Sequence, residues 1–207
     1  MGGFSFSVVI PPLPPVVTLD PDNKGPDQVL SNGNLTVNGG VVGDWEQVYA
    51  TFGRSSGKYY FEMFVGTTTV TYSGVGVGTG AESNETYCGD TADGWSDMAM
   101  GITNGRFYNS SYTSITGSGY NLNDVVMVAV DLDDNKIWFG KNDTWIGVGS
   151  PNPATGTDAA FTNLNTGTLY PSIYTYSQDN ILTARFFASH FSYSPPSGFS
   201  AWDSWTI

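Results

Sequence analysis

Alternating apolar and polar positions between residues 125 and 141 predict a two-stranded β-hairpin. Valines stand at every second position from 126 to 130, and successive side chains of a strand point to opposite faces. The alternation resumes at Ile137 and Phe139, after the polar Asp-Asp-Asn run at 133–135. That run has the composition of a tight turn. One face of the hairpin is therefore expected to lie on a hydrophobic core.

Short apolar runs recur along the rest of the chain, separated by clusters of Gly, Asn, Asp and Ser. This spacing is typical of an all-β sandwich, and no segment has the period of an amphipathic helix. We predict a two-sheet antiparallel β-sandwich with loops at 78–95, 108–120 and 147–168. The expected strands are residues 28–37, 48–52, 58–65, 73–77, 97–102, 106–108, 125–131, 136–141, 170–174 and 181–186.

Residues 1–24 differ in kind from the rest and predict an extended arm before a sandwich at 25–207. The segment FSFSVVIPPLPPVVTL is uncharged and rich in proline, which favours a polyproline II or edge-strand path. Such an arm has to dock, either on its own sandwich or on another subunit. The side chains expected to anchor it are Phe4, Phe6, Val8, Val9, Ile10, Leu13, Val16 and Val17.

Composition narrows the class of protein. The 207 residues suit one domain, and charged residues are only 13% of the chain, about half the usual share. A net charge of -12 with seven scattered Lys and Arg argues against binding to nucleic acid. The amino terminus lacks the positive start of a signal peptide, and no apolar run approaches the about 20 residues of a membrane span. We expect a soluble protein without a typical export signal.

Candidate catalytic groups are sparse. A glycoside hydrolase on a sandwich fold needs two facing carboxylates, whereas Glu62 is the only acid in its predicted strand. His190, the only histidine, has no nucleophile-elbow pattern around it. Cys88, the only cysteine, has acidic rather than basic neighbours, so neither a disulfide nor a reactive thiol is expected. The sequence predicts no catalytic residue, no metal ligand and no cofactor.

Two acidic groups invite a calcium interpretation. The run from Asp131 to Asn135 has oxygen-bearing side chains at alternate positions, but it lacks the glycine and the final acid of an EF-hand loop. We interpret it as a hairpin turn. Asp90, Asp93 and Asp97 form a looser group in a predicted loop, and a weak calcium site there stays an open alternative.

Aromatic residues give the best indication of binding. Several lie in or beside polar turns, where flat rings can stack on sugars or fill a pocket in a protein partner. The candidate ligand-binding residues of the loops are Tyr72, Tyr87, Trp95, Tyr112, Tyr120, Tyr174 and Tyr176. Four other aromatics are assigned to the core, namely Trp45, Trp138, Trp145 and Trp202.

The order of several short segments resembles the SPRY domain, a concanavalin-like β-sandwich used for recognition. The segments include LSNGNLTV at 30–37, GKYYFE at 57–62, GVGVG at 74–78 and the stretch 125–145. The resemblance extends over about residues 28–203. It departs from the family at 185–188, where Arg-Phe-Phe-Ala stands near the place of an Asn-Phe-Gly type segment. It implies binding of peptides or proteins through loops, without chemistry.

The chain is rich in Gly, Asn and Thr, and in this respect it resembles the SPRY domains of bacteriophage structural proteins. That resemblance implies a multi-copy virion protein on the surface of the particle. Residues 1–24 would attach it to capsid or tail proteins, and the sandwich would serve decoration and adhesion to host glycans or proteins. The alternatives are a free module that binds a peptide or protein, and a glycoside hydrolase of concanavalin-like fold. Neither nucleic acid nor a membrane span is expected.

Overall fold

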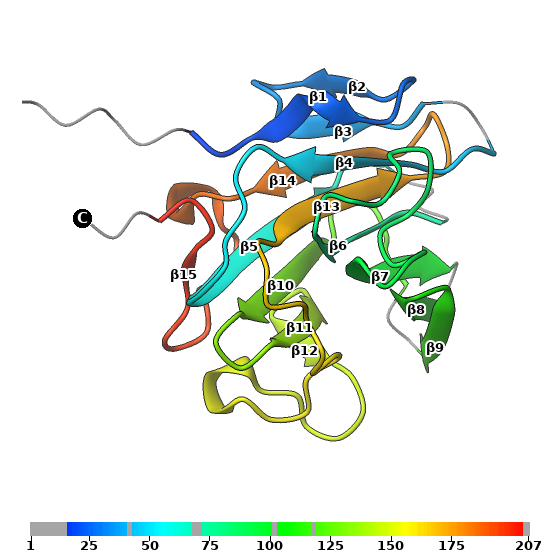
Figure 1. Ribbon diagram of the computed structural model, residues 1–207. Helices are drawn as coiled ribbons and strands as arrows, with labels where there is room; N and C mark the ends of the chain where they lie inside the picture. Colours follow the sequence, from blue (N-terminus) through cyan, green and yellow to red (C-terminus); the bar gives the residue numbers. More distant parts are fainter. Residues whose placement is uncertain (1–15, 41–42, 68–71, 101–102, 117–118, 205–207) are drawn as a thin grey trace, which may run out of the picture.

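The computed structural model describes residues 16–40, 43–67, 72–100, 103–116 and 119–204, and shows two antiparallel β-sheets packed face to face (Figure 1). Helix is confined, within these ranges, to two single turns of 3-10 type, η1 (Pro153–Thr155) and η2 (Ala188–His190). The predicted all-β, two-sheet sandwich is thus confirmed. The described residues contain no helix with the length and apolarity needed to cross a membrane.

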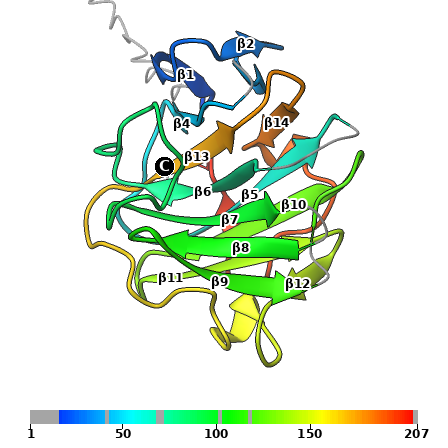
Figure 2. The same ribbon diagram turned by 90° about the vertical axis from the view of Figure 1, so that its right-hand side faces the viewer.

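The first sheet has seven strands in the order β1-β4-β13-β6-β7-β8-β9. Figure 2 shows its strands β6 to β9 side by side, in front of strands of the other sheet. The bounds are β1 (Leu19–Lys24), β4 (Glu46–Ala50), β13 (Tyr170–Thr175), β6 (Gly74–Gly78), β7 (Gly94–Met100), β8 (Thr103–Tyr108) and β9 (Ser111–Thr116).

The second sheet has the order β12-β11-β10-β5-β14-β3-β2, and β15 pairs in parallel with β5. Strand β5 is the most enclosed, because β10 covers one of its edges while β14 and β15 share the other. The bounds are β12 (Thr144–Ile146), β11 (Lys136–Lys141), β10 (Val125–Asp131), β5 (Lys58–Val65), β14 (Ile181–Arg185), β3 (Thr36–Asn38), β2 (Val29–Ser31) and β15 (Ser200–Ala201).

Strands β5, β10 and β11 have the bounds that the alternation predicts. The expected strand at 28–37 is instead the hairpin β2–β3, whose turn contains Asn32, Gly33 and Asn34 at positive φ. The predicted loop at 108–120 is wrong in part, because β9 runs through it as the edge strand of the first sheet. An edge strand exposed to solvent does not need apolar alternation, and the sequence SYTSIT lacks it, although its Tyr, Ile and Thr residues favour a strand.

The segment 17–24, assigned to the arm, belongs to the sandwich. Val17 and Leu19 are fully buried in the main core, and Leu19 pairs with Ala50 of β4. Val17 therefore docks on its own sandwich, the first of the two alternatives for the arm, and is not free to anchor another protein. Val16 is 67% exposed. The other predicted anchors, Phe4, Phe6, Val8, Val9, Ile10 and Leu13, lie outside the described residues.

The main core lies between the sheets and a smaller cluster lies outside the second sheet. Trp202 is fully buried in the main core, as predicted. Trp138 is buried in the outer cluster, and Trp145 is half-buried against it. Trp45 was wrongly assigned to the core: it is half-buried on the outside of the first sheet.

Glu62 of β5 fastens the C-terminal segment to the second sheet. Its carboxylate is fully buried and accepts hydrogen bonds from the Tyr60 hydroxyl (2.9 Å) and from the backbone N–H groups of Ser192 (2.8 Å) and Tyr193 (2.9 Å). It also forms an ion pair with Arg185 at 3.2 Å. Because protein donors surround it, a sugar has no access to this carboxylate. Glu62, on which the glycoside hydrolase alternative depended, has a structural role: it holds the C-terminal segment on the second sheet.

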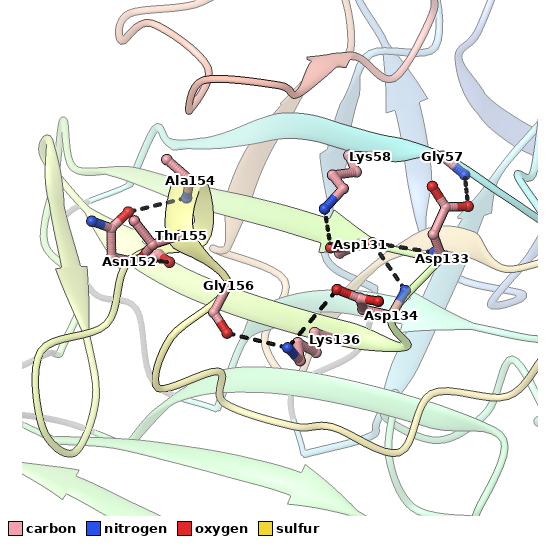
Figure 3. A network of polar contacts seen from close by, with 10 residues as sticks. All are labelled: Gly57, Lys58, Asp131, Asp133, Asp134, Lys136, Asn152, Ala154, Thr155 and Gly156. Atoms are coloured by element: carbon pink, nitrogen blue, oxygen red, sulfur yellow. Dashed lines mark hydrogen bonds and ion pairs between the residues drawn. The ribbon is translucent and has the colours of Figure 1, made fainter.

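The acidic run at the end of β10 is a hairpin turn, as predicted (Figure 3). The buried Asp131 carboxylate accepts hydrogen bonds from the backbone N–H groups of Asp133 (3.2 Å) and Asp134 (3.1 Å) and from the Lys58 ammonium of β5 (2.6 Å). Asp133 in turn accepts from the Gly57 N–H at 2.8 Å. These oxygens are bound by protein donors, which ties the turn to the start of β5.

Candidate binding surface

The outer face of the first sheet carries an aromatic cluster. Along β7, Trp95 and Ala99 point into the main core, whereas Met98 and Met100 point outward. The outward-facing rings gather over β7, β8 and β13 and over the loops beside them. We call this surface the aromatic face, and it comprises Trp45, Tyr72, Tyr87, Phe107, Tyr112, Tyr174 and Tyr176.

The rings form one contiguous set centred on Trp45. The Trp45 ring centroid lies 4.6 Å from that of Tyr176, 4.9 Å from that of Tyr87 and 6.0 Å from that of Tyr72. Tyr87 continues the set to Phe107 at 5.3 Å. Edge-to-face and offset contacts at such distances are the arrangements that aromatic pairs prefer. The face is therefore a rigid, preformed surface.

Two tyrosines of this face are open to solvent. Tyr112, which stacks on Phe107 at 5.5 Å, is 58% exposed, and Tyr72 is 40% exposed. Tyr72 also has a φ of 57°, a left-handed conformation that costs a bulky residue about 1–3 kcal/mol. The backbone here is held in an unfavourable conformation that presents a ring at the surface. Such strain is concentrated at functional sites.

The structure brings together four of the seven predicted binding residues as accessible rings: Tyr72, Tyr87, Tyr112 and Tyr176. Tyr174 is fully buried and forms the floor beneath them, where its hydroxyl hydrogen-bonds with Ser96. The prediction that Tyr174 is a loop residue in direct contact with a ligand is therefore wrong.

Trp95 and Tyr120 are wrong as binding candidates, because both lie inside the sandwich. Trp95 is fully buried on the inner side of β7 and stacks on Tyr108 at 5.4 Å. Tyr120 is 4% exposed, and its hydroxyl donates to the Asp97 carboxylate. Sequence analysis missed Trp45 and Phe107. For Trp45 a signal existed in the polar Gly43-Asp44 that precedes it.

Asp97 does not join Asp90 and Asp93 in a calcium site. Its carboxylate faces the sandwich interior, pairs with Arg106 at 3.6 Å, and accepts from Asn104 and Tyr120. Burial raises the pKa of Asp97, and these neighbours partly oppose that shift. Asp90 accepts instead from the Thr86 hydroxyl at 2.9 Å. Within the ranges that the structure describes, no group of three or more His, Cys, Asp or Glu is placed to hold a metal.

A buried carboxylate shapes the loop between β6 and β7, which carries Tyr87. Glu82 is 6% exposed and accepts from the Gly89 N–H (3.2 Å), the Thr91 N–H (2.8 Å) and the Thr91 hydroxyl (2.9 Å). These bonds fold the loop onto the sheet. Cys88 is fully buried under it, and this burial raises the pKa of the thiol well above its ordinary value. The thiol therefore lies away from solvent and from oxidants.

The pH dependence of stability should reveal the buried carboxyl group of Glu82. Desolvation raises the pKa of Glu82 above its ordinary value of 4.5, although bonds from Thr91 and Gly89 oppose the shift. Because the pKa of Glu82 is raised in the folded state, its contribution to the free energy of unfolding is complete below about pH 4.5. That contribution is lost as the pH rises through the folded-state pKa. We expect urea midpoints of the wild-type protein to fall between about pH 5 and pH 8.

The matched variant for this prediction is Glu82→Gln, which keeps an acceptor for Gly89 and Thr91 without a charge. Its midpoint should fall less steeply over the same range. Burial also raises the pKa values of Glu46 and Asp97, so some slope remains. Equal slopes for the two proteins would contradict this role of Glu82.

Comparison with solved structures places the fold among SPRY domains. The SPRY domain of human HERC1 superimposes with a TM-score of 0.64 at 20% sequence identity, over 81% of this chain and 96% of that chain. The PSpry domain of TRIM65 gives a TM-score of 0.62 at 15% identity, over 81% and 90%. Stonustoxin gives 0.59 at 19%, and this chain covers 26% of its length. Comparison with curated proteins found no significant match.

The class that the fold defines is a two-sheet antiparallel β-sandwich. The SPRY domain family model matches residues 58–187, so this chain belongs to the SPRY domain family. SPRY domains are generally protein-binding modules.

Proposed function

We propose that this chain is a non-enzymatic SPRY module that binds a peptide or protein segment through the aromatic face. The observation that supports this most is the contiguous set of rings around Trp45, with Tyr72 and Tyr112 open to solvent. Tyrosine and tryptophan supply large contact areas with few rotatable bonds, and they are enriched among the residues that dominate binding energy. Tyr72 at positive φ adds a conformational cost that a binding role explains.

The geometry suits an extended partner better than a small ligand. The rings run from Tyr176 through Trp45 and Tyr87 to Phe107 and Tyr112 in successive contacts of 4.6 to 5.5 Å. A chain lying along this line would meet several rings in turn, while β7, β8 and β13 keep the surface rigid. Binding to such a preformed surface loses little conformational entropy on the side of the module.

Selection from a displayed peptide library tests this function. Peptides that bind the wild-type protein should lose affinity at least about tenfold, or about 1.4 kcal/mol, with Tyr112→Ser and with Tyr72→Asn. Asn tolerates the left-handed backbone of position 72, which offsets part of the loss of the ring contacts with Trp45 and Tyr176, so this variant should stay folded. Val148→Ser serves as the control, because Val148 is 80% exposed and follows β12 of the second sheet. Peptides unaffected by both tyrosine variants would overturn the proposal.

We further propose that the module is displayed in many copies on a bacteriophage virion, attached to capsid or tail proteins by the apolar residues before Val17. This proposal rests on the sequence, since residues 1–16 are uncharged and rich in proline. Val16 is 67% exposed, and Val17 is the first described residue that is buried in the sandwich. The aromatic face would then contact a host protein or glycan.

Cross-linking within purified phage particles tests the virion placement. We expect cross-links between residues 1–16 and a capsid or tail protein, identified by mass spectrometry. Particles that lack this chain altogether would contradict the placement, and the peptide-binding function would stand without it.

A further inference from the structure

An acidic hollow of about 370 Å³ opens beside the aromatic face, where β4 begins. Four carboxylates line it together with Trp45, namely Asp27, Asp44, Glu46 and Glu85. Asp27, Asp44 and Glu85 are exposed and form the rim, whereas Glu46 is 3% exposed. Trp45 therefore belongs both to this hollow and to the aromatic face.

Glu46 has one satisfied oxygen and one that lacks a partner. Its Oε1 accepts a hydrogen bond from the Asp27 N–H at 2.8 Å. Its Oε2 is buried and has no hydrogen-bond partner among the residues that the structure describes. Leaving a buried acceptor unpaired costs about 1–3 kcal/mol, and more for a charged group. A native protein retains such an atom at a cost, which a ligand can offset.

The surroundings of Glu46 hold its side chain in place and compensate its charge only in part, through the Asp27 N–H and the charge of Lys24. Gly25 and Gly40 pass so close to Glu46 that a side chain at either position would collide with it. The ammonium of Lys24 donates to the carbonyls of Gly25 (3.0 Å) and Pro26 (3.4 Å). Among the described residues, no cation lies within 4.0 Å of a Glu46 oxygen. Burial accordingly raises the pKa of Glu46, and the charge of Asp27 raises it further.

We propose that this hollow receives the guanidinium group of an arginine in the protein partner, which deepens the proposed function and rests on it. A guanidinium is planar, stays charged when partly buried, and offers five N–H donors. It can donate to a rim carboxylate while it stacks on the Trp45 ring, and it would then lie over the buried carboxylate of Glu46. A metal ion fits less well, because the described carboxylates form no group that could hold one.

Binding of a small probe tests the hollow without any selected partner. In an NMR titration, N-acetyl-arginine amide should shift the Trp45 indole N–H signal until the signal no longer changes. A potassium salt keeps the ionic strength constant throughout. N-acetyl-citrulline amide has nearly the same shape without the charge, and it should bind at least about tenfold more weakly, the factor that 1.4 kcal/mol represents. Equal shifts with both compounds would overturn the proposal.

Matched variants locate the effect. Glu46→Gln keeps an oxygen for the Asp27 N–H but removes the charge, and should weaken binding of the arginine probe about tenfold or more. Asp44→Asn tests the rim and should weaken it less. Asp179→Asn, at an exposed position after β13, should leave it unchanged. The folded spectrum of each variant serves as the check on structure. Wild-type affinity in Glu46→Gln would overturn the proposal.

The peptides selected against the aromatic face separate this inference from the function it rests on. Selected peptides that contain arginine and lose affinity in Glu46→Gln support both proposals. Peptides that depend on Tyr112 but lack arginine and ignore Glu46→Gln would overturn the arginine site and leave the function intact. Binding of the arginine probe alone, without any peptide that depends on Tyr112, would support the site and overturn the function.

Discussion

Replacing Glu62 by alanine should lower the free energy of unfolding by about 3–5 kcal/mol, the cost of removing one partner from a buried ion pair. The substitution leaves Arg185, the Tyr60 hydroxyl and the N–H groups of Ser192 and Tyr193 without their shared acceptor. Arg185 keeps its hydrogen bond to the Ser192 hydroxyl and its contact with the Phe64 ring, whereas the other three donors lose the acceptor they share. Urea unfolding followed by tryptophan fluorescence measures the loss.

The same variant should release the C-terminal segment locally. Amide hydrogen exchange at residues 192–193 should accelerate more than exchange at β6 and β7, which belong to the other sheet. Asp179→Ala serves as the control, because exposed surface substitutions usually change stability by less than about 0.5 kcal/mol. A Glu62→Ala protein as stable as this control would show that the fastening contributes nothing.

The Asp97–Arg106 pair inside the sandwich gives the second large effect. Asp97→Ala should cost about 3–5 kcal/mol, since it leaves the guanidinium of Arg106 buried without its ion-pair partner. Arg106→Met alone should cost a comparable amount, because it leaves the Asp97 carboxylate unpaired. The Asp97→Asn, Arg106→Met double variant removes both charges, while the amide oxygen introduced at position 97 still accepts from the Tyr120 hydroxyl.

The double variant should therefore be more stable than either single charge-removing variant. A thermodynamic cycle of denaturant midpoints measures this coupling, with Asp97→Asn completing the fourth corner. Additive losses across the cycle would contradict a buried pair whose members compensate each other. The outcome also bears on the calcium alternative, because a carboxylate engaged by Arg106 is not available to a metal.

The sandwich and its central strands could be predicted because their signal is local. In β5, β10 and β11, side chains alternate or form short apolar runs between turn residues, and the structure places all three at the expected bounds. The segment of β1 was assigned to the N-terminal arm, for which an edge-strand path was one of two expectations, and it contains Pro21 beside two acidic residues. They are tolerated because β1 is an edge strand.

The binding surface could be predicted only in part, because local sequence does not say which side of a sheet a ring occupies. Trp95 and Met98 are three residues apart on β7 and therefore lie on opposite faces of the sheet. Trp95 enters the main core, whereas Met98 supports the aromatic face. The gathering of Trp45 with Tyr87 and Tyr176 depends on strands distant in sequence meeting at one end of the first sheet. No pattern along the chain indicates the unpaired oxygen of Glu46, which arises from packing against Gly25 and Gly40.

The enclosure of β5 has a consequence for biosynthesis. This strand is translated before β14, β15 and the segment that binds Glu62. A nascent chain that stops before β14 therefore carries a central strand with one open edge, which is prone to pairing with other chains. The sandwich is completed only after these segments are translated, and we expect truncation before residue 181 to yield aggregates rather than a smaller folded domain.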